Sequence, residues 1–206
     1  MKKLLLVIGL FMFCITGMQA QQNPCFGLKI VGGISNITNG DNSFSFKPSF
    51  GIGGTCRYTF SPNFAIQPEV LVSFKGAKDS YSHSLLNKDY DITFNATYLE
   101  IPILFKGIFG SNSIYAGPYF AFALNSEITI DIPVLGEQGV DDIAKSSEIG
   151  ICAGYERYFT RNFSAEARFS YGFTEIFDIT DNEVKDYVGT DFKNYSIIIG
   201  LNYYFK

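Results

Sequence analysis

The stretch FSAEARFSYGFT, residues 163–174, alternates strictly between apolar and polar side chains. Its odd-numbered positions hold Phe163, Ala165, Ala167, Phe169, Tyr171 and Phe173, and its even-numbered positions hold Ser164, Glu166, Arg168, Ser170, Gly172 and Thr174. A period of two with one apolar face predicts a β-strand that meets apolar surroundings on one side only. Because Glu166 and Arg168 lie in the middle of the polar face, the fold depends on where that face points.

The same period recurs in seven other stretches, so the sequence predicts eight strands. They are FGLKIVGGIS (26–35), PSFGIGGTCRYTF (48–60), FAIQPEVLVSFK (64–75), residues 95–106, SIYAGPYFAFAL (113–124), EIGICAGYERYF (148–159) and YSIIIGLNYYF (195–205). Each is long enough to cross a bilayer as a tilted strand, which takes roughly 9–11 residues. The composition agrees, because 21 Phe, 13 Tyr and 20 Gly favour strands and tight bends over helices.

Two architectures use strands with one apolar face. A soluble barrel turns that face inward, whereas a membrane barrel turns it toward lipid and keeps a polar interior. The polar faces here carry charges in mid-strand, namely Lys29, Arg57, Glu69, Glu100, Glu156, Glu166 and Arg168. Aromatic residues lie at the ends of the stretches, namely Phe60, Phe64, Phe105, Phe159, Phe163, Tyr203 and Phe205. Both features favour the membrane barrel, whose interfaces carry aromatic girdles.

The connections between the stretches alternate in length. Residues 61–63, 107–112 and 160–162 form short turns, whereas residues 36–47, 76–94, 125–147 and 175–194 form long, polar connections. Bacterial outer-membrane barrels have short periplasmic turns and long external loops. We therefore predict an all-β fold: an eight-stranded, antiparallel, up-and-down transmembrane barrel with both chain ends on the periplasmic side.

The fourth stretch contains YLEIPILFKG, residues 98–107, in which a carboxylate and a proline interrupt an apolar run. In a membrane barrel the apolar positions 99, 101, 103 and 105 would face lipid, and Glu100 and Pro102 would face the interior. There Glu100 could meet a basic partner such as Lys29, Arg57 or Arg168. Pro102 lacks a ladder hydrogen bond, so we expect a β-bulge near it.

The first twenty residues, MKKLLLVIGLFMFCITGMQA, have the form of a secretory signal peptide. We expect residues 1–20 to be removed, for export to the outer membrane, and residues 21–206 to form one barrel domain; an uncleaved anchor helix is the alternative. Removing Lys2 and Lys3 would leave 14 basic against 20 acidic residues. Such an acidic chain argues against nucleic acid as a partner.

Two motifs carry a family resemblance. YLEIPILFK (98–106), followed by GPYF (117–120), resembles the outer-membrane β-barrel family of Bacteroidetes that is often called PorT-like. The QAQ junction (19–21) and the C-terminal NYYFK (202–206) agree with it. The resemblance covers essentially the whole mature chain, and it implies an eight-stranded outer-membrane barrel without a shared catalytic motif.

The inward-facing charges form the main candidate site. The basic positions are Lys29, Arg57, Lys75, Lys106, Arg168 and Lys206, and the acidic positions are Glu69, Glu100, Glu156 and Glu166. Because side chains just fill the interior of an eight-stranded barrel, we interpret these charges as a salt-bridged plug. The alternative is a narrow path for ions or protons.

Other candidate sites lie in the long connections. His83, in SYSHS (80–84) near Asp79, could serve an enzyme at the barrel rim, but nothing positions a nucleophile beside it, and we interpret it as a solvated loop residue. The acidic connections could hold Ca²⁺ or Mg²⁺, yet DITDNE (178–183) lacks the spacing of a calcium loop. We expect no catalysis, no cofactor and no bound metal.

The predicted protein is an integral outer-membrane barrel with a structural or binding role carried by its long external loops. Its expected partners are outer-membrane lipids and lipopolysaccharide, and other envelope proteins that contact the loops. A narrow, porin-like channel and an enzyme at the rim are alternatives. A fourth possibility is a soluble, lipocalin-like barrel that binds an apolar ligand.

Overall fold

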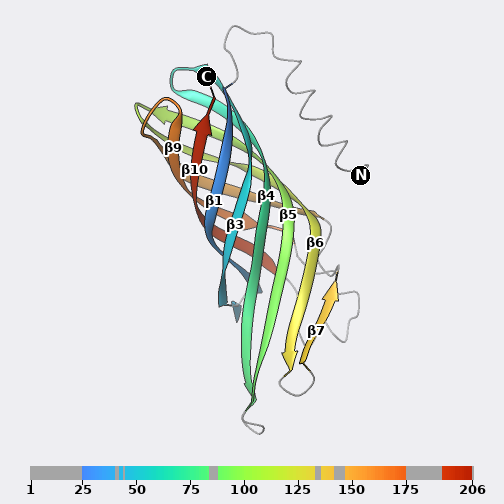
Figure 1. Cartoon of the computed structure of the whole chain (residues 1–206). Helices are drawn as coiled ribbons and strands as arrows, with labels where there is room; N and C mark the ends of the chain where they lie inside the picture. Colours follow the sequence, from blue (N-terminus) through green and yellow to red (C-terminus); the bar gives the residue numbers. More distant parts are fainter. Residues whose placement is uncertain are drawn as a thin grey trace.

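A computed structural model describes residues 25–39, 42–43, 45–83, 88–132, 136–141, 147–174 and 192–205 (Figure 1). The strands are β1 (Cys25–Asn39), β2 (Asn42–Ser43), β3 (Ser45–Ser61), β4 (Phe64–His83), β5 (Lys88–Phe109), β6 (Asn112–Ile132), β7 (Gly136–Asp141), β8 (Ser147–Tyr158), β9 (Phe163–Gly172) and β10 (Lys193–Tyr204). These described residues contain no helix that is long and apolar enough to cross a membrane. The predicted signal peptide and Lys206 lie outside the described residues.

Eight of the described strands form a closed antiparallel barrel. The order around the sheet is β10, β9, β8, β6, β5, β4, β3, β1, and β1 pairs with β10 from Gly27↔Tyr204 to Thr38↔Lys193, which closes it. The short strands β2 and β7 pair only with the ends of β1 and β6. The eight-stranded antiparallel barrel predicted from the sequence is confirmed.

The apolar faces point outward and the polar faces inward. Ile52 of β3 is 58% exposed and Ile199 of β10 is 67% exposed, whereas Lys29, Glu69 and Asn202 are completely buried. A chain with this arrangement is stable where hydrocarbon surrounds it, because water would otherwise meet a continuous apolar belt. The lipocalin-like alternative is wrong, since it requires the apolar face to line the interior.

Three neighbouring strands extend well past the rest of the barrel (Figure 1). β4, β5 and β6 have 20, 22 and 21 residues, whereas β8, β9 and β10 have 12, 10 and 12. Most of the predicted connections 76–94 and 125–147 is therefore strand, paired out to His83↔Lys88 and continued by β7. The prediction of loops there is wrong because the strand pairing continues although the apolar positions change sides: Phe94 and Ala96 of β5 are buried and face inward, so the outward apolar face is lost. The predicted connection 175–194 lies mostly outside the described residues.

The predicted bulge is also misplaced. The pairing of β5 with β6 keeps one register across Pro102, from Pro102↔Tyr119 to Phe105↔Ala116. The register instead shifts between Thr97 and Tyr98, where Leu124 of β6 is the additional residue. Pro102 faces the interior as expected, and β5 continues through it without an extra residue.

Candidate functional site

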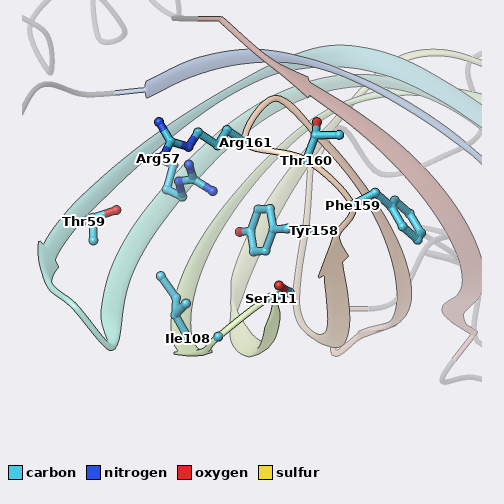
Figure 2. Close-up of a pocket in the computed structure, with 9 residues that line it drawn as sticks. Arg57, Thr59, Ile108, Ser111, Tyr158, Phe159, Thr160 and Arg161 are labelled. Carbon is cyan, nitrogen blue, oxygen red and sulfur yellow. The ribbon is translucent and has the colours of Figure 1, made fainter.

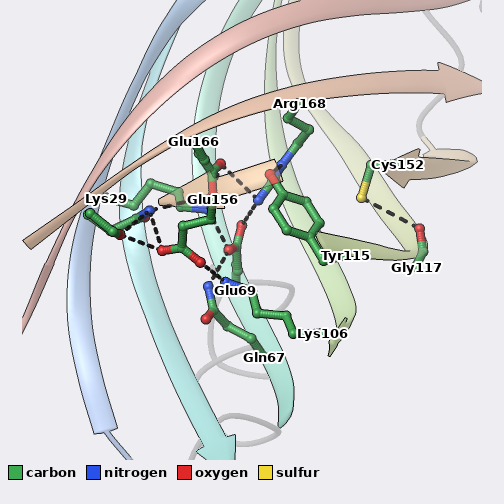
Figure 3. A network of polar contacts seen from close by, with 12 residues as sticks. Lys29, Gln67, Glu69, Lys106, Tyr115, Gly117, Cys152, Glu156, Glu166 and Arg168 are labelled. Atoms are coloured by element: carbon green, nitrogen blue, oxygen red, sulfur yellow. Dashed lines mark hydrogen bonds and ion pairs between the residues drawn. The ribbon is translucent and has the colours of Figure 1, made fainter. Parts of the chain in front are cut away.

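The interior charges lie in three clusters along the barrel, and the central one joins opposite walls (Figure 3). Lys29 of β1 donates to Glu69 of β4 and to Glu166 of β9, with Nζ–Oε distances of 2.9 and 3.0 Å to Glu166. Arg168 of β9 contacts Glu69 at 2.7 Å and Glu166 at 3.1 Å. Two cations thus neutralise two carboxylates, and each carboxylate contacts both cations.

A second cluster is centred on Glu156 of β8, nearer the short turns. Lys106 of β5 forms an ion pair with it, and Ser164 of β9 donates to its other oxygen. Asn202 and Tyr204 of β10 also donate to Glu156, at 3.1 and 2.9 Å. Three strands therefore contribute these donors to one buried carboxylate, which compensates for its lost hydration.

A third cluster lies toward the extended end of the barrel. Lys75 of β4 forms an ion pair with Glu100 of β5. Tyr119 of β6 donates to Glu148 of β8, and the Lys75 ammonium lies 5.6 Å from the centre of the Tyr119 ring. Asn194 of β10 donates to Glu148 at 3.4 Å. Through these contacts the cluster links β4, β5, β6, β8 and β10 along the inner wall.

Tyrosine rings fill the space between the clusters. The ring of Tyr115 has Lys106 at 5.1 Å and Arg168 at 5.3 Å from its centre, and Arg168 Nε donates to its hydroxyl at 3.2 Å. Tyr98 and Tyr119 are also buried. Such contacts add cation–π attraction to the ion pairs and leave little space for water.

The structure places six of the seven mid-strand charges in these clusters: Lys29, Glu69, Glu100, Glu156, Glu166 and Arg168. The partner of Glu100 is Lys75, so the three partners expected from the sequence are wrong. The strand stagger decides such partners, and composition does not reveal it. Arg57 stands apart near the short turns and forms no ion pair with a carboxylate within the described part of the chain.

Two kinds of interior residue were missed in the sequence. Glu148 lies two positions before Gly150 and on the same face as Glu156, so strand parity alone could have placed it inside. The interior tyrosines could be found by the same parity, because Tyr98 lies on the inward face with Glu100. Cys152, in contrast, lies on the inner face as its strand parity predicts; it is buried, and its thiol donates to the Gly117 carbonyl at 3.5 Å.

The other candidate residues are not assembled into a site. Within the described residues, no group of three or more His, Cys, Asp or Glu side chains is arranged to hold a metal. His83 is the last residue of β4, and its backbone is paired with that of Lys88. The acidic stretch 178–183 lies outside the described residues.

The chain was compared with known protein families and with solved structures, and one family matches most of it. The outer membrane protein beta-barrel domain family matches residues 19–178. Neisserial surface protein A has a similar solved structure, with a TM-score of 0.55, 12% identity, and coverage of 89% of this chain and 100% of that one. Ail, the attachment invasion locus protein of Yersinia pestis, gives a TM-score of 0.52, 15% identity, and coverage of 90% and 100%.

No curated protein sequence matches the chain. At the identities above, the solved structures support the fold alone, and the family match covers most of the sequence. The chain therefore belongs to the outer membrane protein β-barrel domain family, and its place is the bacterial outer membrane.

Proposed function

We propose that this protein is an integral outer-membrane barrel with a sealed interior, which acts as a structural or binding protein through its extended end. The observation that carries the proposal is the dehydration of the interior charges. Lys29, Glu69 and Glu156 have no exposed surface and Lys106 has 1%. An ion path needs charged groups that water or ions can reach. The interior charges of this barrel are instead buried and paired with one another.

Single-channel recording tests the sealed interior. The purified barrel in planar bilayers is expected to give no discrete steps above the lipid background. A Lys29→Ala/Glu166→Ala variant removes one cation and one carboxylate, leaves only the Arg168–Glu69 pair of the central cluster, and is the matched control for an opened interior. Discrete, reproducible conductance in the unmodified protein would support the narrow channel instead.

The extended end offers a surface for a basic partner. On β5, β6 and β7, Asp91 is paired with Asp131, and Asp131 with Glu137. Three acidic residues at neighbouring register positions give this end an acidic sequence, which favours a basic surface of another envelope protein as its partner. The solved Ail structure includes a complex with the heparin analogue sucrose octasulfate; an acidic end disfavours such a polyanion here.

Binding of an oligolysine peptide tests this role. The barrel is expected to bind it in low salt and to release it as salt screens the charges. An Asp131→Asn/Glu137→Gln variant should bind several-fold more weakly, while a neutral control, Thr129→Asn/Gln138→Asn, should bind like the parent. Equal binding by all three proteins would refute the assignment of this end.

We further propose that the protein has no catalytic activity and lies among the PorT-like barrels of Bacteroidetes. The two motifs behind that resemblance are neighbours, because Ile101 and Pro102 pair with Phe120 and Tyr119. A Cβ at Gly117 would lie 1.9 Å from the Ile103 carbonyl oxygen, so glycine is required there. The motifs therefore serve strand packing. A hydrolytic activity that His83→Ala abolished would contradict the proposal.

A further inference from the structure

A pocket of about 550 Å³ opens at the short-turn end of the barrel (Figure 2). Its lining residues come from the end of β3, from the turn between β5 and β6, and from the turn between β8 and β9. They are Arg57, Thr59, Ile108, Gly110, Ser111, Tyr158, Phe159, Thr160 and Arg161. None of the clusters described above uses this space.

Arg57 forms the inner side of this pocket. β3 and β8 lie on opposite sides of the closed sheet, and the Arg57 guanidinium lies over the rings of Tyr204 and Tyr158, at 4.4 and 5.1 Å from their centres. Both tyrosine hydroxyls donate to Glu156, each at 2.9 Å. The two tyrosines therefore contact both Arg57 and Glu156, and Glu156 already has other donors.

Arg57 retains an unused donor. Its Nε is buried and has no hydrogen-bond partner. Leaving a buried donor of a charged group unpaired is costly. A ligand with acceptor oxygens would remove that cost.

The rest of the pocket also suits an anion. Arg161, from the turn between β8 and β9, brings a second guanidinium, and Figure 2 shows both arginines on one side of the opening, with Tyr158 nearby. Thr59, Ser111 and Thr160 add hydroxyl donors. Among the described residues that line the pocket there is no carboxylate to neutralise the two positive charges.

We propose that this pocket binds a phosphate group through Arg57 and Arg161. Phosphate carries up to two negative charges and several acceptor oxygens, and guanidinium groups bind it in a bidentate manner. The group could come from a soluble phosphate compound or from a phospholipid headgroup. The second source is reasonable because Phe159 lines the pocket and packs near Phe163 at the barrel end, where aromatic girdles mark the headgroup level.

NMR of the arginine Nε–H groups tests the proposal. The folded barrel is prepared in a maltoside detergent without phosphate and titrated first with inorganic phosphate, then with dihexanoyl-phosphatidylglycerol. Arg157 is exposed at the same end of the barrel but does not line the pocket, so its signal reports nonspecific attraction between phosphate and exposed arginines. Arg168, buried in the central cluster, reports any change in the interior.

The expected result is a saturable shift of the Arg57 and Arg161 signals, with little change at Arg168 and no saturation at Arg157. Arg161→Gln should weaken the binding about tenfold, the size of one lost charge-assisted contact, and the control Arg157→Gln should not. Saturation with inorganic phosphate indicates a soluble source, and saturation with the lipid alone indicates a headgroup. Equal shifts at Arg157 and Arg57, or equal affinity in both variants, would overturn the proposal.

Arg161 lies in an exposed turn, so its variant does not depend on refolding of the interior.

Discussion

Each carboxylate of the central cluster contacts two buried cations, at least one of them from another strand, so its removal is more damaging than an ordinary surface change. Glu69 contacts both Lys29 and Arg168. Without it, Glu166 alone would face two buried cations. Single substitutions in the interior are therefore expected to lower stability, even though the outer surface of the barrel tolerates many different apolar side chains.

Glu69→Ala is expected to lower the free energy of unfolding by roughly 3–5 kcal/mol, because it leaves a buried charge without its partner. Glu100→Ala should also destabilise the barrel, through Lys75. Urea unfolding of the protein in phospholipid vesicles measures both effects. Arg57→Ala is the comparison: it loses cation–π contacts of about 0.5–2 kcal/mol and no ion pair. Equal losses for Glu69→Ala and Arg57→Ala would contradict the ion-pair account.

Two adjacent glycines of β1 give a second prediction for single residues. A Cβ at Gly33 would lie 2.1 Å from the Ile197 carbonyl oxygen, whereas a Cβ at Gly32 would meet nothing within 4 Å. Gly33→Ala should therefore destabilise the barrel by about 1–3 kcal/mol through strain, and Gly32→Ala should leave it unchanged or slightly more stable. The same unfolding measurement compares them, and similar values for the two variants would show that β1 and β10 are not so closely packed.

The strands show which features a sequence of this kind reveals. Strict alternation identified the eight barrel strands and their faces, because the bilayer requires one continuous apolar face. It did not reveal that β4, β5 and β6 continue past the other strands. In the extension of β5 the apolar positions change to the inward parity, as the buried Phe94 and Ala96 show, so the outward apolar face that marks a barrel strand ends there. It also did not identify Lys75 as the partner of Glu100, because that pairing depends on the stagger between β4 and β5.

The orientation of β10 leads to a prediction about depth in the membrane. Ile199 lies in the middle of the strand and is 67% exposed, while Tyr203 lies near its end. Ile199→Lys should cost about 2–4 kcal/mol, and Tyr203→Lys about 0–1 kcal/mol, because the cost of a charge on the lipid face falls toward the interface. Unfolding in vesicles gives both values. A smaller cost at Ile199 than at Tyr203 would contradict the placement of β10.

The whole molecule combines an apolar outer belt, a neutralised polar interior and two unlike ends. One end has short turns and the pocket with Arg57 and Arg161, and the other is an extension of β4, β5 and β6 with β7. The barrel is closed by the pairing of β1 with β10, so its stability depends on the complete chain of strands. The belt suits it to the outer membrane, and the two ends are where we propose that partners bind.

Gel mobility of the protein extracted with detergent from outer membranes, with and without boiling, tests the central claim of an integral, closed barrel most directly. Closed membrane barrels remain folded in cold SDS. We predict that the protein appears in the outer-membrane fraction and that its band shifts on heating. A protein that is soluble without detergent, with one unchanged band, would contradict the account.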